Sequence, residues 1–137
     1  MNLLEATAHV NGGVSVELGG HSLAIADEAV HNYPRLREFD GRPVIVGLRA
    51  GDLYPGSERT DIPSLTARIE LVEALGGESM AYFHVDARHI KAEQSEEEDI
   101  LASESGETVV GTRPNLVASF PPHVQLRLGE EVPVAVE

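Results

Sequence analysis

Apolar and polar residues alternate most regularly in residues 64–85, SLTARIELVEALGGESMAYFHV. The first half places Leu65, Ala67, Ile69 and Leu71 at alternate positions, which is typical of a strand with one buried face. In the second half, residues 80, 82 and 84 face one side and residues 81, 83 and 85 face the other. Gly76-Gly77 lets the chain reverse between them, so the pattern predicts a β-hairpin. A helix over residues 65–75 is the alternative, because Leu65, Ile69, Val72 and Leu75 also fit a 3.6-residue period.

Short strands joined by glycine turns are predicted before this hairpin. Residues 3–10, 14–18 and 22–26 favour three strands, with turns at Asn11-Gly12-Gly13 and Gly19-Gly20. Residues 27–39 predict a short irregular or helical connection that is broken by Pro34. The run PVIVGLR, residues 43–49, predicts a central strand buried on both faces, in which Gly47 indicates a bulge or a close backbone approach.

A polar linker over residues 54–61 separates a first part, residues 1–56, from a second part, residues 62–137. The acidic stretch 91–106 is predicted to be a solvated loop. Residues 107–113, 115–120 and 132–136 complete the set of short strands. Many short strands with Gly and Pro turns, and little helical period, predict an all-β barrel or sandwich.

Composition narrows the range of partners. The 137 residues suit one domain, or two very small subdomains that share a core. With 4% aromatic residues and no Trp, that core must be built from Val, Leu, Ile and Ala. The net charge of −13 repels phosphate backbones and anionic membranes, so nucleic acid is not an expected partner. No cysteine, no long apolar run and no secretion signal occur, so we expect a soluble cytoplasmic protein.

Motifs of catalysis are absent from the sequence. Lys91 is the only lysine and no P-loop surrounds it, so we expect this chain not to hydrolyse ATP and to hold no cofactor. The chain also lacks a G-x-S-x-G elbow and an H-E-x-x-H pair.

The best remaining constellation is His84, Asp86 and His89 in FHVDARH, since imidazole and carboxylate both suit zinc. It is also the site that we expect if the chain is an enzyme of unrecognised type. The acidic run 96–99 lacks the oxygen spacing of a calcium loop. Arg49 and Asp52 follow an apolar run and either pair locally or face a partner. The other histidines are interpreted as ordinary surface or edge residues: His9, His21, His31 and His123.

Two motifs, in this order, resemble a known family. VIVGLRAGDL (residues 44–53) followed by LTARIELVEALGGE (residues 65–78) is similar to the C-terminal regulatory domain of the ATPase subunits of sugar-importing ABC transporters, of the maltose and multiple-sugar type. Gly47-Leu48-Arg49 stands where that family has a strand ending in Gly-Ile-Arg-Pro-Glu. The stretch VEALG, residues 72–76, stands at its Val-Glu-x-Leu-Gly turn. Ala50-Gly51 departs from the family's Pro-Glu, and the chain looks like an excised domain without the nucleotide-binding half.

The resemblance implies an OB-like barrel of the TOBE or MOP type, built of two interleaved subdomains that form one intertwined unit. Such domains pair with their twin as a homodimer, contact the ATPase domain and the transmembrane permease subunits at the inner face of the membrane, and receive regulatory proteins. The parent subunit, by resemblance, binds ATP and Mg²⁺. Gly47 and Glu73 lie in the two motifs expected to face partners, so they are the partner-binding residues that the resemblance implies.

Two other functions stay open. The first is a free-standing small-ligand binder of related fold, which would take an oxyanion. The net charge of −13 argues against tight binding of an anion. A nucleic-acid-binding OB-fold needs basic grooves and stacking aromatics, and the chain has three Phe, three Tyr and no Trp.

Overall fold

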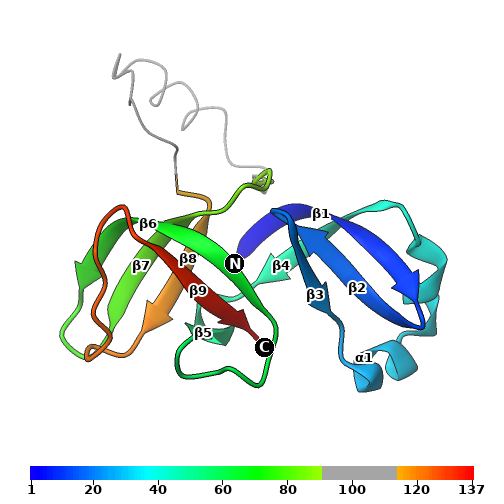
Figure 1. Cartoon of the computed structure of the whole chain (residues 1–137), viewed down its shortest axis with the longest axis horizontal. Coiled ribbons are helices and arrows are strands. Elements are labelled where there is room, and N and C mark those ends of the chain that lie inside the picture. Colours follow the sequence, from blue (N-terminus) through cyan, green and yellow to red (C-terminus); the bar gives the residue numbers. More distant parts are fainter. Residues whose placement is uncertain (91–113) are drawn as a thin grey trace, which may run out of the picture.

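The computed structural model describes residues 1–90 and 114–137, and these form two antiparallel sheets side by side in an elongated molecule (Figure 1). The elements, in chain order, are β1 (Asn2–Asn11), β2 (Gly13–Leu18), β3 (His21–Ala24), α1 (Asp27–Asn32), η1 (Pro34–Phe39), β4 (Pro43–Leu48), η2 (Ala50–Asp52), β5 (Leu53–Pro55), β6 (Ser64–Ala74), β7 (Ser79–His84), β8 (Leu116–Phe120) and β9 (Glu131–Val136). The predicted all-β class is confirmed.

The first sheet has the order β3-β2-β1-β4 and carries α1 and η1 at its far end (Figure 1). Its hairpins form at the predicted glycine turns, where Gly12, Gly19 and Gly20 all have positive φ. The helical connection broken by Pro34 is also confirmed, since α1 ends at Asn32 and the 3₁₀ turn begins at Pro34.

The second sheet has the order β5-β9-β6-β7-β8. Its edge strands β5 and β8 contact each other, so the sheet curls into a nearly closed barrel. The strand interpretation of residues 64–85 is confirmed and the helical alternative is wrong: β6 pairs with β7 from Arg68↔His84 to Ala74↔Ser79. The predicted final strands at 115–120 and 132–136 correspond to β8 and β9. The predicted loop 91–106 and strand 107–113 lie outside the described residues.

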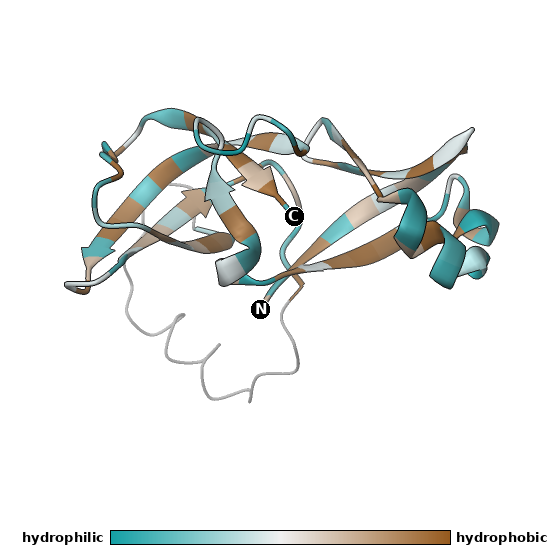
Figure 2. Cartoon of the chain, turned by 90° about the horizontal axis from the view of Figure 1, so that it is seen from below, coloured by the Kyte–Doolittle hydropathy of each residue, from teal (hydrophilic) through white to brown (hydrophobic). Residues whose placement is uncertain are grey.

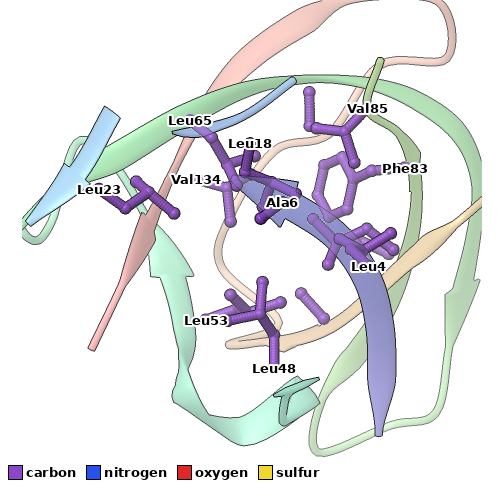
Figure 3. Close-up of a cluster of buried hydrophobic side chains, with 14 of the residues drawn as sticks. Leu4, Ala6, Leu18, Leu23, Leu48, Leu53, Leu65, Phe83, Val85 and Val134 are labelled. Atoms are coloured by element: carbon purple, nitrogen blue, oxygen red, sulfur yellow. The ribbon is translucent and has the colours of Figure 1, made fainter. Parts of the chain in front are cut away.

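One hydrophobic core joins the two sheets. Leu4, Leu18 and Leu48 of the first sheet meet Phe83, Leu65 and Val134 of the second in a single buried cluster (Figure 3). Phe83 and Phe120 are also buried in it, with ring centroids 5.7 Å apart, so the prediction of a core built from Val, Leu, Ile and Ala misses its two largest side chains. Hydropathy alternates along the strands, as the period-two pattern requires (Figure 2).

Three details of the sequence interpretation are wrong. Residues 43–49 were predicted to form a central strand buried on both faces, but β4 is an edge strand of the first sheet, and Ile45 is 59% exposed. Leu71 was predicted on the buried face, but the register shifts between Ile69 and Leu71, so Leu71 pairs with Tyr82 on the outer face. The stretch assigned to a polar linker begins with β5, in which Leu53 and Pro55 are buried and paired with β9.

Gly47 causes no bulge, because the β1–β4 register runs unbroken through Leu3↔Gly47. The close approach at this glycine comes from side chains: a Cβ there would lie 2.9 Å from Met1 Sδ and 3.4 Å from Leu3 Cδ2. The first sheet is built from residues 2–48 and the second from residues 53–136, with the 91–113 stretch undescribed.

Candidate functional site

Glu73 lies near the end of β6, on the outer face of the β6–β7 hairpin, and its side chain is exposed. The Tyr82 hydroxyl donates a hydrogen bond to Glu73 Oε2 at 3.2 Å. The negative charge of Glu73 raises the pKa of Tyr82, since a phenolate beside a carboxylate is disfavoured. Glu78 lies beyond the turn and accepts a hydrogen bond from Ser119 Oγ of β8. The hairpin therefore presents a negatively charged surface that is held in place by its neighbours.

Apolar side chains accompany these carboxylates. Leu71 is 45% exposed and Leu75, next to the Gly76 turn, is 56% exposed. Leu71 pairs with Tyr82, and Tyr82 pairs with Val117 of β8, so an apolar row crosses three strands of the outer face. Exposed apolar groups beside fixed charges are a common composition for protein contact surfaces.

Gly47 lies on the edge strand β4 of the other sheet, and it too is exposed. Arg49 directly precedes the 3₁₀ turn η2, and Asp52 is the last residue of that turn. The local contact between them is made by the backbone, in which the Asp52 N–H donates to the Arg49 carbonyl at 3.0 Å. Gly47 and Glu73 thus belong to different sheets, and the fold does not bring the two residues into one site.

The His84, Asp86 and His89 constellation is not assembled. His84 ends β7 opposite Arg68, Asp86 is exposed in the turn that follows, and His89 forms a β-bridge with Leu4 of the first sheet. Among residues 1–90 and 114–137, no group of three His, Cys, Asp or Glu side chains is arranged to hold a metal ion. The zinc hypothesis therefore has no geometric support.

Three of the remaining histidines form hydrogen bonds through their side chains. His9 lies 3.1 Å from Glu17 on the β1–β2 hairpin, and His123 lies 2.8 Å from Glu58. His21 instead contacts the other sheet, because its Nε2 accepts a hydrogen bond from the Thr66 backbone N–H at 3.2 Å. Sequence reasoning interpreted His21 as an ordinary edge residue. No signal in the sequence pairs residue 21 with residue 66, since the contact depends on how the two sheets pack.

Charged groups also gather where β5 and β9 end. Arg59 bonds Asp61 through Nε at 3.0 Å and stacks 5.1 Å from the centre of the Tyr54 ring. The guanidinium of Arg59 lowers the pKa of Asp61, while the carboxylate of Glu137 raises the pKa of Tyr54. Through Arg59, the loop after β5 is held against Tyr54 of β5 and against Glu137, which follows β9. We therefore assign these contacts a structural role.

An apolar cavity of about 580 Å³ lies on the inner face of the first sheet. Strands β1 to β4 form its floor, and α1, η1, Pro63 and Val136 complete the wall. Glu137 is the one charged side chain among the described residues that line it. Volumes of this size accommodate small organic ligands, and the lining favours uncharged ones.

No helix in the described parts of the chain combines the length and the apolar character needed to cross a bilayer. In comparisons with known proteins, the chain matches no family model and no curated protein.

Proposed function

We propose that this chain is a non-catalytic regulatory and dimerisation domain of the ATPase subunit of an ABC importer for sugars or related carbohydrates. In that role it would hold two ATPase subunits together and receive regulatory proteins. The proposal starts from the order of the two motifs around Gly47 and Glu73 and from the OB-like, TOBE-type barrel that the resemblance implies. The all-β, barrel-like fold is compatible with it.

The observation that supports this proposal best is the exposure of both motif residues. Glu73 lies on the outer face of a hairpin beside exposed Leu71 and Leu75, and Gly47 lies on a sheet edge. Residues that serve core packing would be buried instead. Because the two positions lie on different sheets, we infer two separate contact surfaces, one on the barrel and one on the first sheet.

Sedimentation over a concentration series, with and without the separately expressed ATPase half, tests this function. We expect self-association that the ATPase half strengthens. Glu73→Lys should weaken it at least tenfold, because the variant reverses the charge at the proposed contact. Glu28→Lys makes the same charge change on α1, outside the proposed contact. This control variant should associate as the original chain does. A monomer at every concentration, indifferent to the ATPase half, would contradict the proposal.

The cavity favours a second candidate, a free-standing small-ligand binder. For a free-standing binder of related fold, the ligand predicted from the sequence is an oxyanion. However, no cationic side chain occurs among the described residues that line the cavity. The cavity therefore suits a compact uncharged apolar molecule. We expect micromolar binding of N-phenyl-1-naphthylamine, an uncharged fluorescent probe, and its loss in Ala29→Trp, which fills the cavity from α1. Sulfate and molybdate should not compete. No probe binding in the original chain would remove this candidate.

A further inference from the structure

Strand β6 has a backbone hydrogen-bond donor, the Thr66 N–H, that its neighbour β7 does not reach. The Ile69 N–H donates to the Glu130 carbonyl on the β9 side at 2.9 Å. Since donors alternate in direction along a strand, the Thr66 N–H points to the opposite side, toward the line of β7. The β6–β7 ladder ends at Arg68↔His84, so β7 offers no acceptor at Thr66.

The first sheet supplies the missing acceptor. His21 begins β3, directly after the Gly19-Gly20 turn, and its Nε2 lies 3.2 Å from the Thr66 nitrogen. The same turn packs on the segment after β7, since a Cβ at Gly19 would lie 3.4 Å from the Asp86 carbonyl oxygen. These two contacts add to the buried packing of Leu18 and Leu23, which flank the turn, and one of the two uses a titratable acceptor.

We propose that His21 forms a pH-sensitive hydrogen bond between the two sheets. Only a neutral imidazole whose proton is on Nδ1 can accept at Nε2. Protonation places an N–H on Nε2, so the ring can no longer accept from Thr66 and presents a donor to a donor. Histidine is the side chain that changes charge between about pH 5 and 8, so mild acid breaks this contact.

Several charged groups lie on the elements packed around this ring. Glu17 on β2 is paired with His9 at 3.1 Å, and Arg68 on β6 is paired with Glu70 at 2.8 Å. His84 ends β7, and Asp86 is the exposed carboxylate beside the turn. These groups lie on β2, β6, β7 and the turn after β7, and the acceptor for the Thr66 N–H is the His21 ring itself.

Acid should remove only this hydrogen bond between the two sheets. At the start of β1, the Glu5 N–H donates to the Arg88 carbonyl and the Ile90 N–H donates to the Leu3 carbonyl, each at 2.8 Å. These backbone bonds do not titrate, and the shared core does not either. We therefore expect protonation of His21 to remove the hydrogen bond to Thr66 while the core contacts of the turn remain and both sheets stay folded.

Nitrogen-15 NMR of the whole chain tests the proposal. At pH 7.5 the His21 ring should show the Nδ1–H tautomer, and on acidification to pH 5.5 the Thr66 amide should shift upfield together with the His21 titration. Hydrogen exchange protection at Thr66 should fall about fivefold, which corresponds to losing one net hydrogen bond. His31, exposed on α1, gives the control ring within the same sample.

Two variants separate the hydrogen bond from other effects of acid. His21→Gln keeps an uncharged acceptor, so its Thr66 amide should stay in place from pH 7.5 to 5.5. His21→Leu removes the acceptor, so its Thr66 amide should resemble that of the original chain at pH 5.5 throughout. An Nε2–H tautomer at pH 7.5, or a Thr66 amide that titrates equally in His21→Gln, would overturn the proposal.

Discussion

The Tyr82 hydroxyl and the Glu73 carboxylate, 3.2 Å apart on the outer face of the hairpin, report directly on the electrostatics of the proposed contact surface. Glu73 raises the pKa of Tyr82 above the ordinary value of 10.0 by its charge and by accepting the hydrogen bond. Glu73→Gln removes the charge, so we expect the pKa of Tyr82 to fall toward 10.0. Absorbance titration of the phenolate near 295 nm measures this shift.

The same coupling has a consequence for stability at high pH. A folded-state pKa above the unfolded value means that the folded chain keeps its proton longer, so this stabilisation is present below about pH 10 and is lost as the pH rises above it. Glu73→Gln should therefore flatten the decline in stability above pH 10. Tyr33 and Tyr54 serve as internal references, and an unchanged titration for all three tyrosines would show that Glu73 does not act on Tyr82.

Two exposed or half-buried glycines allow a prediction about steric fit. At Gly56 a Cβ would lie 2.5 Å from the Pro133 Cβ and 2.8 Å from the Pro133 carbonyl oxygen, both on rigid β9. We expect Gly56→Ala to lower the free energy of unfolding by about 2–3 kcal/mol, since neither strand can shift freely. Urea denaturation measures this loss.

Gly47→Ala is the matched control for that substitution. The new Cβ would meet Met1 Sδ at 2.9 Å, but Met1 is 76% exposed and its flexible side chain can swing away. The expected change is within about 0.5 kcal/mol. If both variants lost the same free energy of unfolding, the flexibility of the contacted side chain would not determine the cost of the added methyl group.

At the scale of elements, the bulge in β6 decides which side chains reach the core. Glu70 is the extra residue between the pairs Ile69↔Phe83 and Leu71↔Tyr82, so the alternation changes sides there. Ile69→Ala should cost about 3–4 kcal/mol because Ile69 is fully buried, and Leu71→Ala should cost less than about 1 kcal/mol. Thermal unfolding of the two variants tests the register. Similar losses would place Leu71 in the core and contradict the bulge.

This bulge also shows where sequence reasoning about β6 stops. Alternation and the Gly76-Gly77 turn predicted the hairpin, because period two and positive φ are local properties. A single inserted residue leaves both signals intact while reversing every later side chain, so Leu71 was misassigned. Only pairing with β7 reveals the shift.

Strand β4 and strand β5 were misinterpreted for a related reason. The apolar run of β4 resembles a strand buried on both faces, but β4 is an edge strand that borders the cavity, and its Ile45 is exposed. In β5, Pro55-Gly56 resembles a turn, although Pro55 is buried and pairs with Val134. An edge strand tolerates proline, since it needs donors on one side only. Sheet order and the His21–Thr66 contact are tertiary facts that local patterns do not encode.

At the scale of the whole molecule, Asn2 connects the two sheets more tightly than any other buried polar side chain among the described residues. It is 7% exposed, and its Nδ2 donates to the Leu48 carbonyl at 3.0 Å and to the Val117 carbonyl at 2.9 Å. Its Oδ1 accepts from the Val117 N–H at 2.8 Å. Leu48 belongs to the first sheet and Val117 to the barrel, so one side chain satisfies backbone groups of both.

Asn2→Ala removes the partner of one buried and two partly buried backbone groups, and we expect a loss of about 2–4 kcal/mol in the free energy of unfolding. Asn11→Ala, at the exposed end of the same strand, should change it by less than about 0.5 kcal/mol. Because the sheets share one core, hydrogen exchange should lose protection equally in β2 and in β7. Loss confined to β2 would instead show that the barrel is stable by itself, and that the first sheet unfolds from it as a separate unit.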